Sequence, residues 1–455
     1  MAPKPDPDLP FRVDPNAPSS PSEAKFTSNV PAPTNEGADA SARINAAVAA
    51  FSVADIEQAR ARIAGHVRVS PCTYSRLLSE RLERHVYLKL ENLQLTGSFK
   101  ERGACNRLLQ LTNEERQRGV VAASAGNHAQ GVAYHARAFG IASTIVMPRT
   151  SPLVKVTQTR DLGATVELVA GGYNEAYDEA LRLAETRGLL LIPGFDDPAI
   201  VAGQGTIGLE ILEQVPSVEL VLVAIGGGGL AGGIATAIKE KRPQVYVCGV
   251  QSEAMPSMRA ALQQGRPIRI ESTRTIADGI AVGQVGALPF GLIQKYVDQI
   301  VTVDDEEIAE AILTLLEREK VVAEGAGAAP LAALIHRELP SDKKTIVLVI
   351  GGGNIDVNVL SRIIDRGLAK SGRIMRLRVR VPDVPGGLAR ILALVAESEA
   401  NILHIEHDRV GARLEFGQAS IDIVAETRGF DHVTAILDAM KAAAFVARIP
   451  KAEDA

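Results

Sequence analysis

Aromatic residues are scarce in this chain. Its 455 residues include no tryptophan, 7 tyrosines and 10 phenylalanines, so aromatic residues make up 4% of the sequence. Lys and Arg number 49 against 54 Asp and Glu, which gives a formal net charge of −5, and neither sign is gathered into a long block. Nucleic-acid binding relies on basic surfaces and aromatic stacking platforms. The composition therefore argues against nucleic acid as the main partner.

Cysteines and long apolar runs are also rare. The three cysteines, Cys72, Cys105 and Cys248, lie far apart and form no C-x-x-C pair. We therefore expect neither a disulfide framework nor a zinc site. No apolar run approaches the roughly 18 residues of a membrane span, so no membrane partner is expected. A reducing, cytoplasmic setting fits these absences best.

The N-terminal segment lacks an apolar period. Its first 40 residues are crowded with proline, serine and asparagine, a composition that does not offset the entropy of ordering. Asp6, Asp8 and Asp14 also argue against a transit peptide, and no secretory signal is expected. We expect residues 1–51 to form a flexible tail.

From about Ser52 onward, helical patterns alternate with short runs rich in β-branched residues. This alternation predicts crossover units and parallel sheets covered by helices, an α/β fold. Because ligands in open α/β sheets bind beyond the carboxyl ends of strands, the polar or glycine-rich segments after the strands are candidate site loops. The clearest expected strands are 120–124, 143–147, 164–170 and 219–225.

The pattern changes after Lys370. Residues 375–381 (MRLRVRV) alternate apolar and charged side chains, the turn PDVPGG follows, and residues 388–400 have the spacing of an amphipathic helix. Further alternating strands and a second helix near 431–443 complete the pattern. Residues 374–450 are therefore predicted to form a separate small α+β module.

The sequence GGGGLAGG at 226–233 is a candidate phosphate cradle. Glycines between a buried strand and a helix start leave backbone N–H groups free to face an anion, and the helix N-terminus adds partial positive charge. The loop lacks the Lys-Ser/Thr of a P-loop. A tight strand-to-helix turn without a ligand is the structural alternative.

Two further segments carry candidate site residues. Lys100, in TGSFKERGA, is either part of a solvated helix face or an amine made nucleophilic by burial, which could attack a carbonyl cofactor. In SAGNHAQ at 124–130, small residues allow close approach of a ligand, and the helix that follows aims N–H groups at an anion such as a carboxylate. Asn127 as an ordinary helix cap and His128 as a structural histidine are the alternatives.

Taken together, these strings resemble one family. SFKERGA, SAGNHAQGVA, AIGGGGLAGG and GGGNID occur in the order seen in pyridoxal-phosphate enzymes of the tryptophan-synthase-like fold, and most nearly in threonine dehydratases. The resemblance covers roughly residues 52–370 and implies a two-domain fold-type II enzyme with parallel-stranded sheets. It implies a large domain of residues 52–118 and 191–370 and a small one of residues 119–190. The module 374–450 resembles an ACT domain, a small amino-acid-sensing fold.

The resemblance also implies roles for single residues. Lys100 is similar to the lysine that holds pyridoxal 5'-phosphate covalently and then removes the α-proton of the substrate. Asn127 is similar to the asparagine that hydrogen-bonds the phenolic oxygen of the cofactor. The remaining implied positions are Phe99 beside the lysine, Gly226, Gly227, Gly228, Gly229 and Leu230 at the phosphate, Glu324 near the pyridine ring, and Ser124, Ala125, Gly126 and His128 at the substrate carboxylate.

Some positions depart from related sequences. Racemases of this fold carry a serine where this chain has Ala125, and a methyl group cannot supply the second proton. Gln251 and Ser257 replace the acidic residues of the racemase-like metal site, so we expect no bound divalent metal. Gly351 replaces a hydroxyl or thiol residue that reaches the pyridine nitrogen. Either water or a neighbouring group substitutes there, or the activity is reduced or redirected.

The family resemblance implies dehydration of L-threonine to an enamine that hydrolyses to 2-oxobutanoate and ammonia, with L-serine giving pyruvate. A dehydratase of another 3-hydroxy amino acid, such as hydroxyaspartate, and a weakly active amino-acid sensor that retains the cofactor are alternatives.

The ACT resemblance implies an amino-acid effector, for which isoleucine is the first candidate because threonine deamination would feed its synthesis. Association of these modules would bury exposed sheet edges, so a homodimer or homotetramer is expected. A module that only holds subunits together is the alternative.

Overall fold

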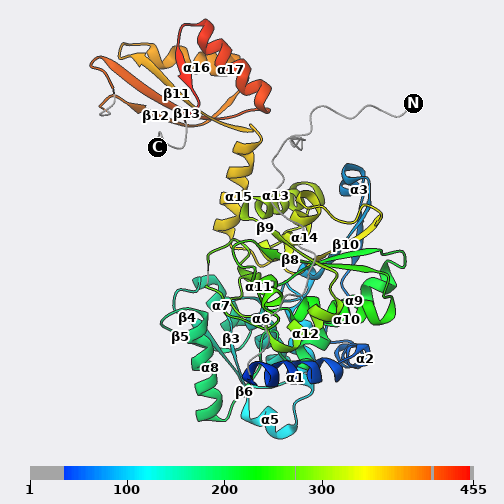
Figure 1. Cartoon of the computed structure of the whole chain (residues 1–455). Helices are drawn as coiled ribbons and strands as arrows, with labels where there is room; N and C mark the ends of the chain where they lie inside the picture. The colour runs from blue at the N-terminus through cyan, green and yellow to red at the C-terminus, as the bar shows by residue number, and fades with distance from the viewer. Residues whose placement is uncertain (1–34, 272, 411–413, 451–455) are drawn as a thin grey trace. The chain divides into compact units, whose positions relative to one another are not determined.

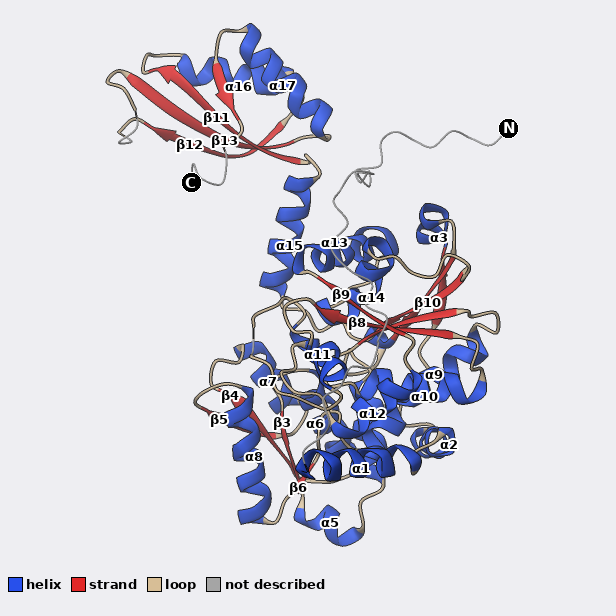
Figure 2. Ribbon diagram, viewed as in Figure 1, coloured by secondary structure: helices blue, strands red, loops and turns tan. Residues whose placement is uncertain are grey.

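The computed structural model describes residues 35–271, 273–410 and 414–450 (Figures 1 and 2). Its internal contacts divide the chain into two units, of which one ends at Asp356 and the other begins at Val357. Each unit has its own sheets and core. In the described part of the chain no helix combines the length and the apolar character that crossing a membrane requires.

The first unit contains a six-stranded sheet in the order β1-β2-β10-β7-β8-β9. All neighbours pair in parallel except β1 with β2, which is antiparallel. Every residue of β7 and β10 is buried, as expected for central strands with helices on both faces. The strands are β1 (Cys72–Ser75), β2 (His85–Leu90), β7 (Leu220–Ala224), β8 (Tyr246–Ser252), β9 (Gln299–Val303) and β10 (Thr345–Ile350).

A smaller parallel sheet in the same unit has the order β5-β4-β3-β6. Its strands are β3 (Val120–Ala123), β4 (Ser143–Pro148), β5 (Thr165–Val169) and β6 (Leu190–Leu191). The four strands expected from the sequence correspond to β3, β4, β5 and β7. The two parallel sheets confirm the predicted α/β fold class.

Helices cover both sheets. The most deeply buried is α9, whose residues from Ile200 to Leu212 are all buried, while α4, α6 and α10 begin at candidate site residues. The helices of the first unit are α1 (Asn35–Ala49), α2 (Val53–Ile63), α3 (Arg76–Leu82), α4 (Lys100–Leu109), α5 (Asn113–Arg118), α6 (Asn127–Ala138), α7 (Leu153–Asp161), α8 (Tyr173–Arg187), α9 (Pro198–Gln214), α10 (Gly229–Lys241), α11 (Ser257–Gln264), α12 (Ala287–Tyr296), α13 (Asp305–Thr314) and α14 (Gly325–His336). Three short helical turns are η1 (Glu91–Leu93), η2 (Asp278–Ile280) and η3 (Leu315–Glu319).

The prediction that residues 1–51 form a flexible tail is wrong for residues 35–51. Helix α1 occupies Asn35–Ala49, and Val48 and Phe51 are buried. Gly291 of α12 lies so close to Val48 that a Cβ at that glycine would overlap the valine. The alanine-rich run INAAVAA favours a helix, and packing on α12 stabilises it. The rest of the expected tail, residues 1–34, lies outside the described residues.

The second unit is an α+β module. Its sheet is antiparallel in the order β12-β13-β11-β14, and β11 alternates buried and more exposed residues, as the sequence MRLRVRV predicts. Helix α15 (Val357–Lys370) groups with this unit by its contacts, whereas the resemblance placed it in the large domain. The other elements are β11 (Ile374–Pro382), α16 (Gly387–Glu397), β12 (Asn401–Asp408), β13 (Gln418–Glu426), α17 (Phe430–Ala442) and β14 (Val446–Arg448).

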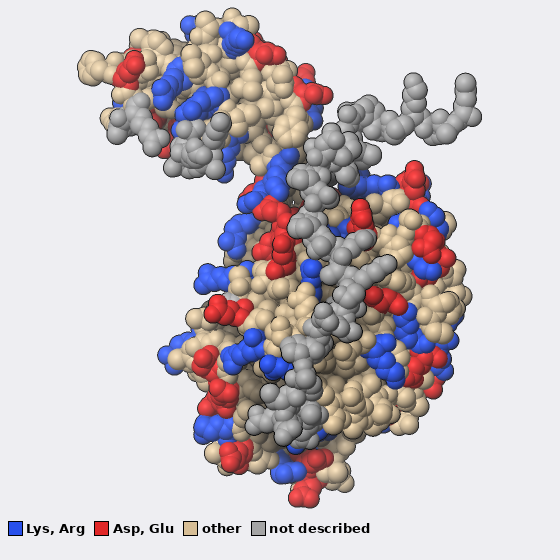
Figure 3. All heavy atoms as spheres, in the orientation of Figure 1, with Lys and Arg blue, Asp and Glu red and all other residues tan. Residues whose placement is uncertain are grey.

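Charged side chains are mixed on the surface. On the face that Figure 3 shows, basic and acidic residues of the described chain are interspersed.

The three cysteines are free, and Cys105 and Cys248 are buried.

Candidate active site

Three loops after parallel strands form the candidate site. Residues 124–127 follow β3, residues 225–228 follow β7, and residues 351–354 follow β10. A Cβ atom on Gly351 would lie 3.3 Å from Cδ1 of Phe99 and 3.8 Å from Cδ2 of Leu230. A Cβ atom on Gly352 would lie 3.1 Å from Nδ2 of Asn127. The structure therefore brings the loop after β10 together with the other two loops and with the segment before α4.

Lys100 is the first residue of α4. Its Nζ donates a hydrogen bond to the carbonyl oxygen of Gly194 at 2.7 Å and lies 5.3 Å from the centre of the Phe99 ring. Burial lowers the pKa of this amine to about 8, although the nearby Glu324 carboxylate acts in the opposite direction. A lysine with this pKa has a substantial neutral fraction near neutral pH, which a solvated helix face would not give.

The turn before Lys100 is held by two backbone pairs to the loop after β10. Phe99 N–H donates to the carbonyl oxygen of Gly351 at 2.9 Å, and Gly353 N–H donates to that of Gly97 at 2.9 Å. Gly97 has a φ of +73°, a conformation that glycine adopts without steric cost. The buried carboxylate of Glu101 also accepts from the N–H groups of Leu95 and Thr96. The position of Lys100 is thus fixed by the backbone hydrogen bonds of the turn before it and by the carboxylate of the residue after it.

Asn127 and Glu324 form one side of the site. Asn127, the first residue of α6, donates from Nδ2 to Oε1 of Glu324 at 2.7 Å. Burial and the charge of Asp278 raise the pKa of Glu324 to about 7, while the hydrogen bond from Asn127 and the charges of Lys155 and Lys100 act against that shift. This carboxyl group can therefore hold or release a proton near neutral pH.

The loop after β3 is compact. Ser124 accepts from the N–H of Gly126 through its hydroxyl oxygen at 3.1 Å, which shapes the turn into α6, and Ala125 and Gly126 add little bulk. His128 is buried and its Nε2 contacts the carbonyl oxygen of Ile192 at 2.9 Å. Burial and the charge of Lys100 lower the pKa of His128 to about 4, so its ring is neutral at physiological pH. Its other ring nitrogen, Nδ1, is buried and has no hydrogen-bond partner in the described chain.

The glycine loop has no room for side chains. Gly228 has a φ of +96°, and a Cβ atom there would lie 2.8 Å from both Met258 and Pro289. A Cβ atom on Gly227 would overlap the Phe195 ring, and one on Gly229 would lie 2.8 Å from the Phe195 carbonyl oxygen. The backbone hydrogen bonds among the described residues include none donated by Gly226, Gly227 or Gly228. These N–H groups, at the start of the 13-residue helix α10, suit an anion such as a phosphate.

The positions that depart from related sequences also have defined surroundings. Gln251 is buried and accepts from the N–H of Arg259 at 2.9 Å, while the buried hydroxyl of Ser257 has no hydrogen-bond partner within the described part of the chain. No group of three or more His, Cys, Asp or Glu residues able to hold a metal occurs among the described residues.

Sequence reasoning missed several site residues. Asn354 is the fourth residue of the quoted string GGGNID and bonds to Asn127, so the motif itself carried a signal for it. Gly194 and Phe195 follow β6 and carried none. Lys155 and Asp278, which form an ion pair at 3.0 Å and influence Glu324, come from distant segments of ordinary composition.

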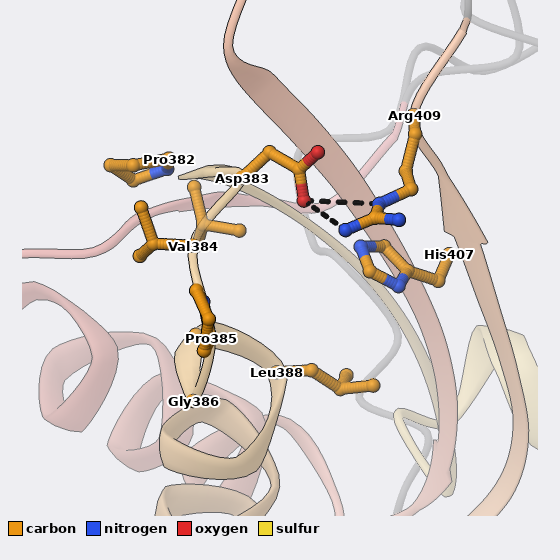
Figure 4. Close-up of a pocket in the computed structure, with 10 residues that line it drawn as sticks. Pro382, Asp383, Val384, Pro385, Gly386, Leu388, His407 and Arg409 are labelled. Carbon is orange, nitrogen blue, oxygen red and sulfur yellow. Dashed lines mark hydrogen bonds and ion pairs between the residues drawn. The ribbon is translucent and has the colours of Figure 1, made fainter.

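The second unit has a hollow of its own beside the PDVPGG turn (Figure 4). Arg409 donates to Oδ1 of Asp383 from Nη2 at 2.6 Å and from Nε at 3.0 Å, and the ring of His407 lies below this pair. Val384 and Leu388 add apolar surface, and Gly386, with a φ of +87°, leads into α16. The hollow thus combines paired charges with a helix start.

Comparisons of this chain with known proteins identify its family. Residues 63–352 match the family of pyridoxal-phosphate dependent enzymes, and residues 375–445 match the ACT domain. The chain is 51% identical over 399 residues to an L-threonine ammonia-lyase of Thermotoga maritima, covering 88% of this chain and 99% of that protein. It is 44% identical over 315 residues to a catabolic L-threonine dehydratase of Escherichia coli, covering 69% of this chain and 95% of that protein.

Solved structures give the same result. A threonine deaminase matches with a TM-score of 0.64 at 41% identity, over 67% of this chain and 99% of that one. Maize serine racemase matches with a TM-score of 0.66 at 32% identity, over 70% and 98% of the two chains. This chain therefore belongs to the family of pyridoxal-phosphate dependent enzymes and carries a C-terminal ACT domain.

Proposed function

We propose that the protein is an L-threonine ammonia-lyase. It removes water from L-threonine to give an enamine, which water then hydrolyses to 2-oxobutanoate and ammonia, and it converts L-serine to pyruvate as a side activity. The observation that carries the proposal is the buried amine of Lys100, held on the Gly194 carbonyl oxygen within the segment that matches the family of pyridoxal-phosphate dependent enzymes. The 51% identity to an ammonia-lyase supports the choice of L-threonine.

The residues of the site fit pyridoxal phosphate. Lys100 offers an amine of lowered pKa for the aldehyde, and the N–H groups of residues 226–229, with Leu230 behind them, suit the phosphate. Asn127 can face the phenolic oxygen, Phe99 packs beside the lysine, and Glu324 lies at the end of the Asn127 amide. When bound, the cofactor supplies an aldehyde that captures the substrate amine and a ring that stabilises negative charge at Cα.

The chain's own residues then move the protons. With the cofactor bound, Lys100 would act as the base that takes the proton from Cα, and a pKa of about 8 leaves part of its population neutral. The N–H groups and small side chains of residues 124–128 receive the substrate carboxylate and fix the Cα–H bond toward the lysine. His128, whose lowered pKa keeps it uncharged, packs behind this loop.

Ala125 favours elimination over racemisation. Racemisation needs an acid or base on the face of the substrate opposite Lys100. The Ala125 methyl group cannot donate or accept a proton. We therefore propose that a proton removed by Lys100 is not replaced from the other side, and that loss of the β-hydroxyl follows instead.

The domain limits belong to the same proposal. Residues 52–118 and 191–370 form the large catalytic domain, residues 119–190 the small one, and residues 374–450 the regulatory module. Because α15 groups with the second unit, the boundary between the large catalytic domain and the regulatory module is better placed at Val357 than after residue 370.

The ACT domain is proposed to bind an amino-acid effector in the hollow beside the PDVPGG turn (Figure 4). The paired charges of Asp383 and Arg409 complement the ammonium and carboxylate of a free amino acid, and the apolar side chains suit isoleucine. An effector acts by favouring one arrangement of the catalytic domains, with a coupling of about 1 to 3 kcal/mol. A homodimer or homotetramer, formed through the sheet edges β12 or β14, is proposed as the assembly.

A cytoplasmic role in isoleucine synthesis completes the proposal. Free cysteines, two of them buried, suit a reducing compartment.

The test is an oxo-acid assay on the purified holoenzyme. L-Threonine, L-serine and 3-hydroxyaspartate are compared, each with and without isoleucine, valine and serine as effectors. We expect 2-oxobutanoate from threonine at the highest kcat/KM, pyruvate from serine at a lower one, and inhibition by isoleucine. Bound cofactor without oxo-acid formation would instead support a sensor, and a preference for hydroxyaspartate would reassign the substrate.

A further inference from the structure

The amide of Asn354 is surrounded by three oxygen atoms. Its Nδ2 lies 2.8 Å from the carbonyl oxygen of Thr96, 2.8 Å from Oδ1 of Asn127 and 3.0 Å from Oε1 of Gln130. These partners belong to the turn before α4 and to α6. One side chain from the loop after β10 therefore links the segment that carries Lys100 to the helix that begins with Asn127.

The direction of these hydrogen bonds is determined by the two groups that can only accept, the carbonyl oxygen of Thr96 and the carboxylate of Glu324. An amide side chain can present either its oxygen or its nitrogen to a neighbour. The Thr96 carbonyl oxygen can only accept, so the nitrogen of Asn354 must face it. The same nitrogen then donates to Asn127, whose oxygen must face Asn354. The nitrogen of Asn127 consequently points the other way, toward the Glu324 carboxylate at 2.7 Å.

We propose that Asn354 is a positioning residue that fixes the orientation of the Asn127 amide. With its oxygen engaged by Asn354 and one N–H engaged by Glu324, Asn127 has a single N–H left for the phenolic oxygen of the cofactor. A reversed amide would present its oxygen there and repel the phenolate. The inference rests on the proposed contact between Asn127 and the cofactor, and extends it to a residue outside that contact.

The surroundings of Asn354 are shaped for this role. A Cβ atom on Gly97 would lie 2.5 Å from Oδ1 of Asn354, so the turn leaves space only for glycine beside the amide. Gln130 lies at the third oxygen position and is bonded through Nε2 to Oε1 of Gln158 of α7 at 3.2 Å. Because an amide nitrogen carries two hydrogens, the two shorter contacts, to Thr96 and Asn127, are the ones that fix the Asn354 amide.

The test replaces Asn354 by Asp, which keeps the shape but cannot donate. The carboxylate then needs a donor, so Asn127 turns its nitrogen toward position 354 and its oxygen toward the cofactor. We expect the dissociation constant of pyridoxal phosphate to rise by about tenfold or more, the equivalent of one lost hydrogen bond and one unfavourable contact. The visible absorption maximum of the bound cofactor should also shift. Asn354→Ala, which adds no buried charge, should show the same changes to a smaller extent and serves if the first variant does not fold.

Asn92→Asp is the matched control. Asn92 also donates through Nδ2 to a backbone carbonyl, that of Val322 at 3.0 Å, but within the described residues this bond does not involve Asn127. This variant should keep the absorption maximum and the cofactor affinity within about twofold.

A double variant separates positioning from a general structural effect. In the Asn127→Ala background, Asn354→Asp should change cofactor affinity by less than about twofold, because the group through which it acts is gone. An equal loss in both backgrounds, or no loss in either, would overturn the inference. If Asn127→Ala alone leaves the absorption maximum and affinity unchanged, the proposed cofactor contact of Asn127 fails instead.

Discussion

The amine of Lys100 and the carbonyl oxygen of Gly194 are 2.7 Å apart, although 94 residues separate them in the sequence. The contact joins the start of α4 to the segment after β6, and so links the two parallel sheets at the site. It holds the amine in place by a group that cannot take its proton. The amine therefore becomes available for chemistry when it leaves this oxygen in its neutral form, which a pKa of about 8 makes accessible.

The first prediction concerns Lys100→Ala. Removal of the amine should abolish covalent attachment of pyridoxal phosphate and lower elimination by several orders of magnitude, because anchor and base are lost together. Lys100→Arg should fail too, since a guanidinium stays protonated. Absorbance of the bound cofactor and oxo-acid formation are the measurements. The control variant Lys295→Ala, at an exposed position near the end of α12, should keep both the absorbance of the bound cofactor and oxo-acid formation. Turnover by Lys100→Ala near the wild-type rate would refute the role of Lys100 as anchor and base.

The second prediction concerns Gly351→Ser. A Cβ atom at this position would lie 3.3 Å from Cδ1 of Phe99, so the ring must shift by a few tenths of an ångström and the fold should be kept. If water fills the space at the pyridine nitrogen, the new hydroxyl should shift the absorption of the bound cofactor or raise kcat modestly. An unchanged spectrum with unchanged kinetics would mean that another group already holds that nitrogen.

Local motifs made much of the site predictable. The glycine loop and the loop 124–128 each follow a buried strand, and their chemistry can be deduced from adjacent residues. Lys100 gained its role only from the resemblance, because its burial depends on β6 and β10, which are distant in sequence. The partners Gly194 and Phe195 could not be predicted, since a backbone carbonyl and an aromatic ring carry no motif.

The fold shows the same division. Runs of β-branched residues predicted β3, β4 and β7 because buried parallel strands are continuously apolar. Strand β5, which is only partly buried, was predicted by its β-branched residues alone. Helix α1 was missed because its flanking sequence is polar, and the contact of Val48 with Gly291 that stabilises it is a tertiary effect. The buried charge cluster around Arg102 was missed as well, because KER in the sequence suggests a surface.

The third prediction concerns that cluster. Arg102 donates to Glu91 at 2.7 Å and to Glu210 at 2.6 Å, and all three are buried. Burial alone would lower the pKa of Arg102, but the two carboxylates outweigh it and raise the pKa above its ordinary value. Arg102→Met should reduce the free energy of unfolding by about 3 to 5 kcal/mol, because the buried Glu91 carboxylate loses its ion-pair partner and Glu210 keeps only Lys89. Chemical denaturation measures this loss.

The control for Arg102 is Arg60→Met. Arg60 pairs with Glu213, but the two side chains are 40% and 58% exposed. Such a pair contributes about 0 to 1 kcal/mol. Equal losses for the two variants would show that burial of the Arg102 cluster does not determine its contribution.

The fourth prediction concerns pH and Glu324. Its pKa in the folded protein is raised to about 7 by burial first and by Asp278 second, above the ordinary value of 4.5. The folded state therefore binds this proton more tightly, so the contribution to stability is fully present below pH 4.5 and is lost as the pH rises through 7. Glu324→Gln lacks this dependence. Relative to the wild type, its free energy of unfolding should rise by on the order of 2 to 3 kcal/mol between acidic and alkaline pH.

The measurement for Glu324 is chemical denaturation at several pH values. Taking the difference between the two proteins cancels groups such as His128, whose lowered pKa acts in the opposite direction. Glu338→Gln, at an exposed position after α14, serves as a control, and its free energy of unfolding should differ from that of the wild type by no more than about 0.5 kcal/mol. A flat difference for Glu324→Gln would mean that its carboxyl group titrates alike in the folded and unfolded states.

The fifth prediction concerns effector recognition by the full-length protein. Arg409→Gln should raise the isoleucine concentration for half-maximal inhibition by about tenfold or more, because the effector carboxylate loses a charge-assisted hydrogen bond. Asp383→Asn should weaken the response similarly through the effector ammonium. Neither residue lies in the catalytic unit, so turnover without isoleucine should stay within about twofold of the wild type.

Arg428→Gln is the matched control for this last prediction. Arg428 forms an ion pair at 3.0 Å with Glu399 in the same module, but it does not line the hollow beside the PDVPGG turn. Its isoleucine response should therefore match the wild type. Because the binding of effector and substrate is coupled reciprocally, threonine should also change the affinity of the wild type for isoleucine. An unaltered response in Arg409→Gln and Asp383→Asn, with an unaltered oligomer, would place the effector elsewhere. A changed oligomer with an unaltered response would leave the module the role of holding subunits together.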